Sequence, residues 1–596
     1  MDIPPAHLRS HLEKILSSAG FAHSQRMSRF LRFAVEQTME GRGDKIKEYL
    51  VGVEVFDKEP SYDPQIDPIV RVEARRLRSK LKRYYETDGR EDALRIDFPK
   101  GSYVPVFQAR NSADPPEIKT IAVLPFVNRS PDPENEYFSD GLTEELIRAL
   151  TKIEGLRVVA PGTAFQFKGK SQDVQQIGEQ LHVSAVLQGS VRRAGTRLRV
   201  TAQLISVRDG CYLWSETYER ELQDVFVIQD EISRAIVNTL RLQLAAGRQT
   251  PLVRRYSDNL EVYSIYLKGR HYFNRRTEEG LKKSIECFEQ ALVADPQYAP
   301  AYAGIADAYS LLAEYGFQVP DQAMPKARTA ALRALEIDDG LAEAETSLAF
   351  VYTTYEWKFE EADRHYRRAL ELNPGYAEAH HWYGYDHLAI LGRLDEAMAH
   401  VELAHQLDPL SMIISASLGG IFLMRREYDR AIEQYRKTLA LDPGFYKGYT
   451  GLGRAYFQKG MYDEAVRYFR KGRVLSAWNR GPSFSDSRLK LGTEGGALYT
   501  AGGLGQSYAM AGETETARHL ASEMERLRED GLYVQATSIA LIYVGLGEPD
   551  RAFHWLDKAC TEREASLLFI SVYPAWDTLR SDPRFVALLQ RIGIVR

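Results

Sequence analysis

The chain has 596 residues, of which 44% are hydrophobic and 27% are charged, and its formal net charge is -5 at pH 7. This length is too great for a single hydrophobic core, so three or four domains are expected. An acidic chain of ordinary composition gives no global sign of a nucleic-acid or membrane partner, and any such signal must therefore be local.

Cysteine usage and apolar runs indicate the compartment. Cys211, Cys287 and Cys560 lie far apart, without the paired spacing of a zinc site, a redox dithiol or a disulfide framework. The first residues carry charges where a secretory signal needs an apolar core. The longest apolar runs are about half of the ~20 residues that a membrane-spanning helix needs. We therefore expect a cytoplasmic, soluble protein with no membrane partner.

The first region, residues 1–108, predicts helices followed by a hairpin. An initial helix is expected over residues 7–18, and three amphipathic helices over residues 25–41, 45–56 and 69–85. Two alternating strands, residues 94–98 and 103–107, follow, and the turn Pro99-Lys100-Gly101 joins them. Residues 109–118 are polar, contain a Pro-Pro pair and are expected to form a linker.

The third of these helices concentrates basic charge. Its apolar residues recur at spacings of four and three and form one stripe: Val70, Ala74, Leu77, Leu81 and Tyr84. Basic residues flank this stripe, and we expect a DNA-binding set that includes the tip of the hairpin turn: Arg71, Arg75, Arg76, Arg78, Lys80, Lys82 and Lys100. Residues 1–110 hold 20 Lys and Arg against 17 Asp and Glu, so the charge is local, and a solvated surface helix is the alternative.

Three helices and a hairpin resemble the winged helix-turn-helix domain of the OmpR/ToxR type. The helix carries the resemblance through Val72, Arg75, Arg76, Leu77, Arg78, Lys80 and Leu81, and the wing through Gly101 and Tyr103. The resemblance implies major-groove binding by Arg71, Arg75, Arg78 and Lys82, with Lys100 on a phosphate or in the minor groove. The chain departs from that family at its start, where a helix replaces a small sheet, and it has no receiver domain.

The middle region, residues 119–245, predicts a mixed α/β domain. A strand near residue 120 precedes a helix that is expected to start at a capping Asp140, and three strands with turns at Ala194-Gly195 and Asp209-Gly210 precede a closing helix. The segments "IAVLPF", "DGLTEELI", "GSVRRAG" and "LWSETYERE" resemble the TolB amino-terminal-like domain of bacterial regulatory proteins, some of which carry an adenylate cyclase domain in front. A second polar linker is expected over residues 246–259.

The last region, residues 260–596, is a repeat array. Pro374, Pro409 and Pro443 are 35 and 34 residues apart, and between them a small residue recurs twelve or thirteen positions before an alanine. The pattern resembles the tetratricopeptide repeat (TPR), a pair of antiparallel helices. About eight repeats are expected, with an insertion near residues 475–500 and a C-terminal capping helix. Such an α-solenoid offers a concave surface to a protein or peptide partner.

Other patterns give no site. His380, His381 and His387 lack the spacing of zinc ligands, and the glycine-rich runs lack the features of a phosphate loop, so no metal and no cofactor are expected. Glu144 and Glu145 are expected to stabilise a helix start through its dipole. No catalytic constellation can be assembled, and the chain is expected not to be an enzyme.

The combination predicts a multidomain, mainly α protein: a winged helix, then a mixed α/β domain, then a TPR α-solenoid. We expect a cytoplasmic bacterial transcriptional regulator that binds double-stranded DNA and receives its signal through the repeats. A signalling scaffold without DNA binding is the alternative. An enzyme related to cyclase-bearing proteins is disfavoured, because the winged helix occupies the place of their catalytic domain. The sequence does not predict the operator, the ligand, the direction of regulation or the oligomeric state.

Overall fold

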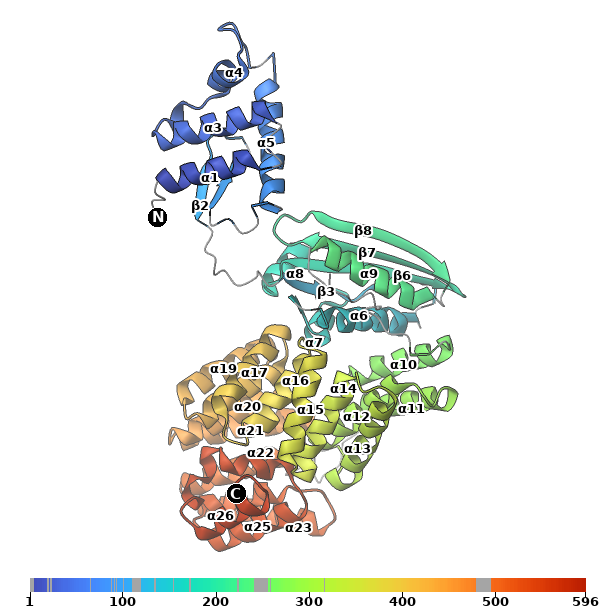
Figure 1. Ribbon diagram of the computed structural model, residues 1–596. Helices are drawn as coiled ribbons and strands as arrows, with labels where there is room; N and C mark the ends of the chain where they lie inside the picture. Colours follow the sequence, from blue (N-terminus) through green and yellow to red (C-terminus); the bar gives the residue numbers. More distant parts are fainter. Residues whose placement is uncertain are drawn as a thin grey trace. The chain divides into compact units, whose positions relative to one another are not determined.

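The computed structural model divides into two compact units, Met1–Glu117 and Ile118–Arg596, which are described separately (Figure 1). It describes residues 5–595 except for the following short stretches: 19–20, 22–23, 65, 87, 90–91, 93, 100, 110–118, 133–134, 154, 171–172, 222–223, 241–255, 258, 316 and 479–494. Almost all of the first predicted linker and most of the second lie outside the described residues.

The N-terminal unit contains the predicted helices followed by a hairpin. Its elements are α1 (Pro5–Ser17), α3 (Gln25–Met39), the 3-10 turn η1 (Gly43–Lys45), α4 (Glu48–Phe56), α5 (Ile69–Glu86), β1 (Leu94–Asp97) and β2 (Val106–Ala109). The two strands pair in antiparallel register, with Leu94 opposite Ala109 and Asp97 opposite Val106. The initial helix is therefore a part of this unit, as the sequence predicts.

A polar network ties α1, α5 and the hairpin together beside the apolar core. The Tyr85 hydroxyl accepts a hydrogen bond from the Ile96 amide at 2.7 Å and lies 3.0 Å from the His11 ring. The Tyr84 hydroxyl donates to Asp92 at 2.7 Å, and Lys14 donates to the other oxygen of Asp92 at 2.5 Å. All of these acceptors are buried, so satisfied hydrogen bonds fix the hairpin against the end of α5.

The second strand begins later than the sequence predicts. The alternation over residues 103–107 favours a strand there, but β2 starts at Val106. The Val104 amide donates to the Ser102 hydroxyl at 3.1 Å, and Pro105 has no amide hydrogen. Local side-chain bonding thus replaces ladder bonding in this stretch.

The middle domain of the second unit is a six-stranded mixed sheet with helices. Its elements are β3 (Lys119–Val123), β4 (Val127–Asn128), α6 (Glu136–Thr151), β5 (Leu156–Val158), α7 (Pro161–Ala164), η3 (Phe165–Phe167), α8 (Val174–Gln180), β6 (Ala185–Ala194), β7 (Arg197–Ser206), β8 (Tyr212–Glu221) and α9 (Val225–Thr239). The strand order is β5-β3-β6-β7-β8, and β4 pairs with β6. Strands β6, β7 and β8 form an antiparallel meander, whose turns place Gly195 and Gly210 at φ of 62° and 66°, where glycine is favoured.

Helices α6 and α9 cover one face of this sheet. Their apolar residues share a core with β6 and β7, for example Leu146 and Ile232 with Leu187 and Val200. The smaller α8 packs on the other face, near the start of β6. The prediction that Asp140 caps α6 is wrong: the helix starts at Glu136, and Asp140 lies buried within it.

The repeat array consists, in the described part of the chain, of eight helical hairpins. Its elements are α10 (Leu260–Phe273), α11 (Glu278–Ala294), α12 (Ala299–Glu314), α13 (Pro320–Ile337), α14 (Ala342–Val351) with η5 (Tyr352–Glu356), α15 (Phe359–Leu372), α16 (Ala377–Trp382) with η6 (Tyr383–Leu388), α17 (Leu394–Leu407), α18 (Met412–Met424), α19 (Tyr428–Leu441), α20 (Tyr446–Gln458), α21 (Tyr462–Trp478), α22 (Gly495–Met510), α23 (Thr514–Glu529), α24 (Ala536–Gly545), α25 (Pro549–Thr561), the 3-10 segments η7 (Ala565–Ser571) and η8 (Pro574–Leu579), and α26 (Pro583–Arg591). The predicted insertion falls between α21 and α22, where residues 479–494 are outside the description.

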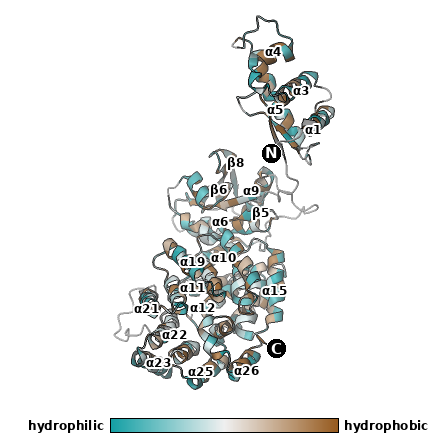
Figure 2. Cartoon of the chain, turned by 90° about the vertical axis from the view of Figure 1, so that its left-hand side faces the viewer, coloured by the Kyte–Doolittle hydropathy of each residue, from teal (hydrophilic) through white to brown (hydrophobic). Residues whose placement is uncertain are grey.

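Close packing within the hairpins follows the predicted pattern. A Cβ atom on Gly419 would lie 2.7 Å from the Tyr435 ring, and one on Gly453 would lie 2.8 Å from the Phe469 ring, so only glycine fits there. Helices such as α15 are amphipathic (Figure 2), with Tyr366 on the buried side. Pro374, Pro409 and Pro443 stand just beyond the ends of α15, α17 and α19.

The middle domain and the first repeats share one hydrophobic core. Leu146 of α6 belongs to the same buried cluster as Tyr263 and Leu267 of α10 and Phe288 of α11. A Cβ atom on Gly141 of α6 would lie 2.5 Å from the Leu267 side chain. The two predicted domains, 119–245 and 260–596, thus pack as one unit. Within the described ranges, no helix has the length and apolarity that crossing a membrane requires.

Candidate nucleic-acid interface

The helix α5 buries the predicted apolar stripe and turns its basic residues outward. Val70, Leu77 and Leu81 are at most 1% exposed, and they hold α5 against α3, α4 and β1. The outward face carries these exposed residues: Arg71, Val72, Arg75, Arg76, Ser79 and Arg83. The predicted ridge of cations therefore exists, with one exposed aliphatic side chain, Val72, within it.

The arginines in the first half of α5 differ in their partners. Arg75 is exposed, and no contact of its side chain is found within the described residues. Arg76 donates to Glu73 at 2.8 Å, one turn earlier. Arg71 donates to Glu48 of α4 at 2.8 Å and also contacts the Pro64 carbonyl. The guanidinium groups of Arg71 and Arg76 are more than half exposed, although their carboxylate partners are not, so a phosphate can reach them from solvent.

Arg78 and Lys80 are engaged within the unit. The Arg78 guanidinium donates to the carbonyls of Phe98, Pro99 and Ser102 at 2.9, 3.1 and 2.9 Å. It therefore holds the turn of the hairpin against α5. The Lys80 ammonium donates to the Ser24 hydroxyl and lies 5.5 Å from the centre of the Phe21 ring. Lys100 and the Lys82 side chain lie outside the described residues.

Glu48 connects α5, α4 and the hairpin. It accepts from Arg71 and is also close to Tyr103, which follows the turn. Burial first, and the charge of Glu48 second, raise the pKa of the Tyr103 hydroxyl to about 12. The structure thus brings together the outward arginines of α5 and the base of the hairpin, and the binding of Arg78 to backbone carbonyls could not be predicted from the sequence.

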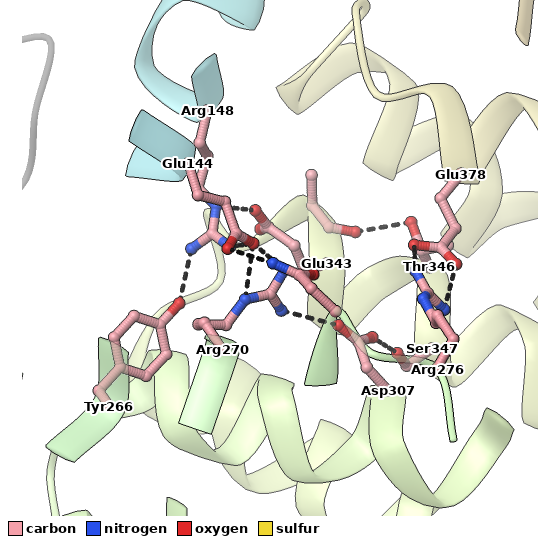
Figure 3. Close-up of polar contacts among 12 residues, drawn as sticks. Glu144, Arg148, Tyr266, Arg270, Arg276, Asp307, Glu343, Thr346, Ser347 and Glu378 are labelled. Atoms are coloured by element: carbon pink, nitrogen blue, oxygen red, sulfur yellow. Dashed lines mark hydrogen bonds and ion pairs between the residues drawn. The ribbon is translucent and has the colours of Figure 1, made fainter. Parts of the chain in front are cut away.

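A buried ionic cluster lies between the middle domain and the first repeats (Figure 3). Arg148 of α6 bonds to Glu343 of α14 at 3.0 Å and donates to the Tyr266 hydroxyl of α10 at 2.8 Å. Arg270 of α10 donates to Glu144 of α6 at 2.8 Å. The prediction that Glu144 merely stabilises a helix start is wrong, because it lies in the middle of α6 and binds a residue of the repeats.

The cluster continues into the repeats through Asp307. Its carboxyl group lies 3.7 Å from Arg270 and accepts a hydrogen bond from Ser347. Burial, and then the negative charge of Glu378, raise the pKa of Asp307 to about 7 despite the opposing charge of Arg270. For Glu144, burial raises the pKa, but the charges of Arg270 and Arg148 outweigh it and hold the pKa below its ordinary value.

The chain's own C-terminal segment lies along the first helices of the later hairpins. We call residues 563–580 the C-terminal strap. Arg563 donates to the Tyr355 carbonyl at 2.9 Å, and the Tyr573 hydroxyl lies 2.9 Å from that of Tyr385. Further contacts reach the turn after α18 and the helices α20, α22 and α24, and they are Arg426–Asp577, Arg454–Tyr573, Gln506–Ala575 and Thr537–Glu564. A part of the face that the sequence assigns to a partner is therefore covered from within the chain.

The histidines of α16 and η6 serve in hydrogen bonds. His380 lies 2.9 Å from His400, His381 lies 2.9 Å from the Ser417 hydroxyl, and His387 lies 3.0 Å from the Thr353 hydroxyl. Among the residues that the structure describes, no group of three or more His, Cys, Asp or Glu side chains is arranged to hold a metal ion.

Two families match parts of the chain. Residues 117–235 match the second domain of HilA/YgeH-like transcriptional regulators, and residues 358–411 and 418–477 match the tetratricopeptide repeat. The chain therefore contains a HilA-like transcriptional regulator domain and TPR repeats, and the prediction of the repeats is confirmed. The resemblances of the middle domain to TolB and of the first unit to an OmpR/ToxR winged helix stay predictions.

Curated relatives match over limited lengths. The chain is 40% identical over 195 residues to "Putative adenylate cyclase 3" of Rhizobium meliloti, which is 32% of this chain and 33% of the relative. It is 23% identical over 254 residues to "Transcriptional regulator HilA" of Salmonella typhimurium, which is 42% of this chain and 44% of the relative. The chain thus spans less than half of the length of these two relatives.

The first of these relatives contradicts one prediction. From its sequence, the protein is expected not to be an enzyme. Yet about a third of the chain is similar to a protein that is named as an adenylate cyclase. We therefore withdraw that prediction. It rested on two grounds, the lack of a catalytic constellation in the sequence and the position of the first unit in the chain, and neither excludes chemistry elsewhere.

Parts of the chain are similar to solved structures. The chain is 27% identical to MamA, over 26% of this chain and 90% of that one, with a TM-score of 0.23. It is 23% identical to the protein titled Pseudomonas aeruginosa pilF, over 38% of this chain and 93% of that one, with a TM-score of 0.27.

Proposed function

We propose that the chain is a cytoplasmic bacterial transcriptional regulator in which the N-terminal unit binds double-stranded DNA and the repeats receive a protein or peptide partner. The outward face of α5 carries the proposal. Its arginines are exposed, they lie on one helix, and the apolar side of that helix is fixed in a core. The HilA-like domain next to this unit supports the same function.

The geometry of α5 suits the major groove. A helix of 18 residues is about 27 Å long, and the groove of B-DNA admits a helix at full width. No side-chain contact of Arg75 is found within the described residues, whereas Arg71 pairs with the partly buried Glu48 and Arg76 with the buried Glu73. Arg75 can therefore bind a phosphate or a base edge directly, and Arg71 and Arg76 can do so by leaving their carboxylate partners.

The hairpin then acts as the wing of a winged helix. Arg78 fixes the turn through its three carbonyl acceptors, so we propose for it a positioning role in addition to the predicted DNA contact. Lys80 and Lys82 of α5, and Lys100, which the sequence predicts in the turn, complete the proposed contact set. A wing that is held by the recognition helix itself moves together with it on the duplex.

The repeats have less free surface for a partner than a solenoid with nothing bound along its helices would have. The strap covers the first helices of the later hairpins, and the middle domain packs on the first hairpins. We propose that a protein or peptide partner binds the remaining surface of the array, and that the shared core passes the effect to the HilA-like domain.

The test is binding of the full chain to a random-sequence duplex across a salt series. Wild type should give a log-log slope of about -4 to -5 or steeper, because about five phosphate contacts of the N-terminal unit alone produce this slope. The variant Arg75→Glu/Arg76→Glu should lose this binding. The matched control Arg9→Glu/Arg26→Glu reverses two exposed charges on other helices of the same unit and should bind like wild type. Salt-insensitive or absent binding by wild type would favour the scaffold function instead.

A further inference from the structure

One face of the antiparallel meander carries a regular array of polar side chains. Helices α6 and α9 cover the opposite face, and α8 packs only near the start of β6. The pairing register places Ser190 opposite Thr201, and Thr201 opposite Thr217. The hydroxyls of Thr201 and Thr217 are 3.2 Å apart. This row of hydroxyl groups runs across three neighbouring strands.

The next row along the strands consists of arginines. Arg192 of β6 lies directly opposite Arg199 of β7. On the other side of β6, Asn128 is paired with Val191, and the Arg129 amide donates to the Val191 carbonyl at 2.7 Å. Arg129 thus continues the register beside Arg192. Arg197 stands one step nearer the turn, opposite Ala194, and shares their face because side chains alternate.

We call Arg129, Arg192, Arg197 and Arg199 the arginine patch. All four are exposed, and the only ion pair found for them among the described residues is that of Arg199 with Glu219, at 3.3 Å and with both side chains more than half exposed. The neighbouring Arg193 points to the other face, where it lies over the Phe138 ring at 5.8 Å. The patch is therefore distinct from the arginines that serve the fold.

Cross-strand pairing with β8, where Glu219 lies opposite Arg199 and Glu221 lies opposite Arg197, accounts for only a part of the patch. Like charges directly opposite each other on neighbouring strands are destabilising, and Arg192 and Arg199 are in this relation. The cost disappears when an anion lies between them. Guanidinium groups and hydroxyl groups are the donors that proteins commonly use for phosphate oxygens, and here the two kinds form adjacent rows.

We propose that the arginine patch binds the phosphate backbone of double-stranded DNA, as a second contact in addition to α5. The inference rests on the proposed function. Neighbouring strands are about 4.8 Å apart, so a row over β4, β6 and β7 is about 10 Å long. The phosphates of one DNA strand rise about 3.4 Å each along the axis, so the row can meet about three of them. The contact does not depend on the DNA sequence, because the patch lies on the face of a sheet and places no helix or strand in a groove of the duplex.

The test compares three forms of the full chain on a 40-base-pair random-sequence duplex in a salt series. The patch variant Arg129→Ser/Arg192→Ser/Arg197→Ser should give a log-log slope shallower by about 2 to 3, since each lost phosphate contact removes about 0.9. The control Arg208→Ser/Arg364→Ser/Arg368→Ser removes the same charge from exposed sites elsewhere and should keep the wild-type slope. Equal slopes for patch variant and control would overturn the inference.

Two more measurements separate this inference from the proposed function. Each single substitution of the patch should lower the slope by about 0.9, which serves as the readout if the triple variant does not fold. The α5 variant Arg75→Glu/Arg76→Glu is measured beside them. If it alone loses binding while the patch variants match the control, the proposed function stands and the patch inference fails. If only the patch variants lose salt-dependent binding, the patch holds and the α5 proposal fails.

Discussion

The buried carboxyl group of Asp307 should make the stability of the second unit depend on pH. Its pKa is raised to about 7 in the folded chain, by burial and by Glu378, from an ordinary value near 3.8. The unfolded chain therefore gives up this proton at a lower pH than the folded chain. The stability that the protonated group contributes is fully present below about pH 4 and is lost as the pH rises to about 7.

The size of the effect follows from these two pKa values. A difference of one pKa unit corresponds to 1.36 kcal/mol, so the complete loss is about 4 kcal/mol. About 2 to 3 kcal/mol of it falls between pH 5 and pH 7.5. The groups that face Asp307 are Arg270 of α10, Ser347 and Glu343 of α14, and Glu378 of α16.

The substitution Asp307→Asn isolates this group. The amide keeps the size of the carboxyl group and can bond to Ser347, but it does not titrate. We expect the free energy of unfolding of the variant, relative to wild type, to rise by about 2 to 3 kcal/mol between pH 5 and pH 7.5. Urea unfolding at several pH values measures this difference.

A matched control keeps the interpretation sharp. Asp395→Asn makes the same change on a side chain that is 92% exposed, and its difference from wild type should stay flat with pH. A flat difference for Asp307→Asn as well would refute the reasoning, because the carboxyl group would then titrate alike in the folded and unfolded chains.

Three further outcomes are expected. Arg270→Met leaves the buried Glu144 without its main partner and should lower the free energy of unfolding by about 3 kcal/mol. Urea unfolding measures this change, and the control Lys282→Met, at an exposed site, should change the free energy of unfolding little. Burial lowers the pKa of His380 to about 4, so the neutral imidazole contributes stability that is lost as the pH falls below about 6.5. The variant His380→Asn should therefore lose about 2 kcal/mol less free energy of unfolding than wild type between pH 7 and pH 5. An unchanged acid dependence would count against a lowered pKa of His380. Tyr573→Phe removes the hydroxyl between Tyr385 and Arg454 and should cost about 1 kcal/mol and speed hydrogen exchange in η7, whereas Tyr212→Phe, at an exposed site, should do neither.

Features with short-range periodicity could be predicted from the sequence. The buried stripe of α5, from Val70 to Tyr84, follows from spacings of three and four. The contact of Gly419 with Tyr435 follows from the repeat, because the same two positions recur in each copy. In both cases the residues that decide the structure lie within about one helix or one hairpin of each other.

Long-range polar contacts could not be predicted. Asp140 and Glu144 have the composition of a helix start, but their partners include Lys168 and Arg270, and the latter is 126 residues from Glu144. Arg78 has the signature of a DNA contact, but its acceptors are backbone carbonyls about 20 residues away. Every residue has a backbone carbonyl, so the sequence does not show which of them accepts a hydrogen bond. The arginine patch likewise becomes visible only when β4 is placed beside β6.

The C-terminal strap has a consequence for how the protein is made. A solenoid of local hairpins can fold as each repeat leaves the ribosome, because every repeat needs only its neighbours. Here several hairpins also form hydrogen bonds with Arg563, Tyr573 and Asp577, which follow all of the hairpins in the chain. Until then the nascent array exposes the apolar surface that Leu567, Leu568 and Trp576 later cover. Closure of the strap is therefore a folding step that follows the synthesis of all the hairpins it covers.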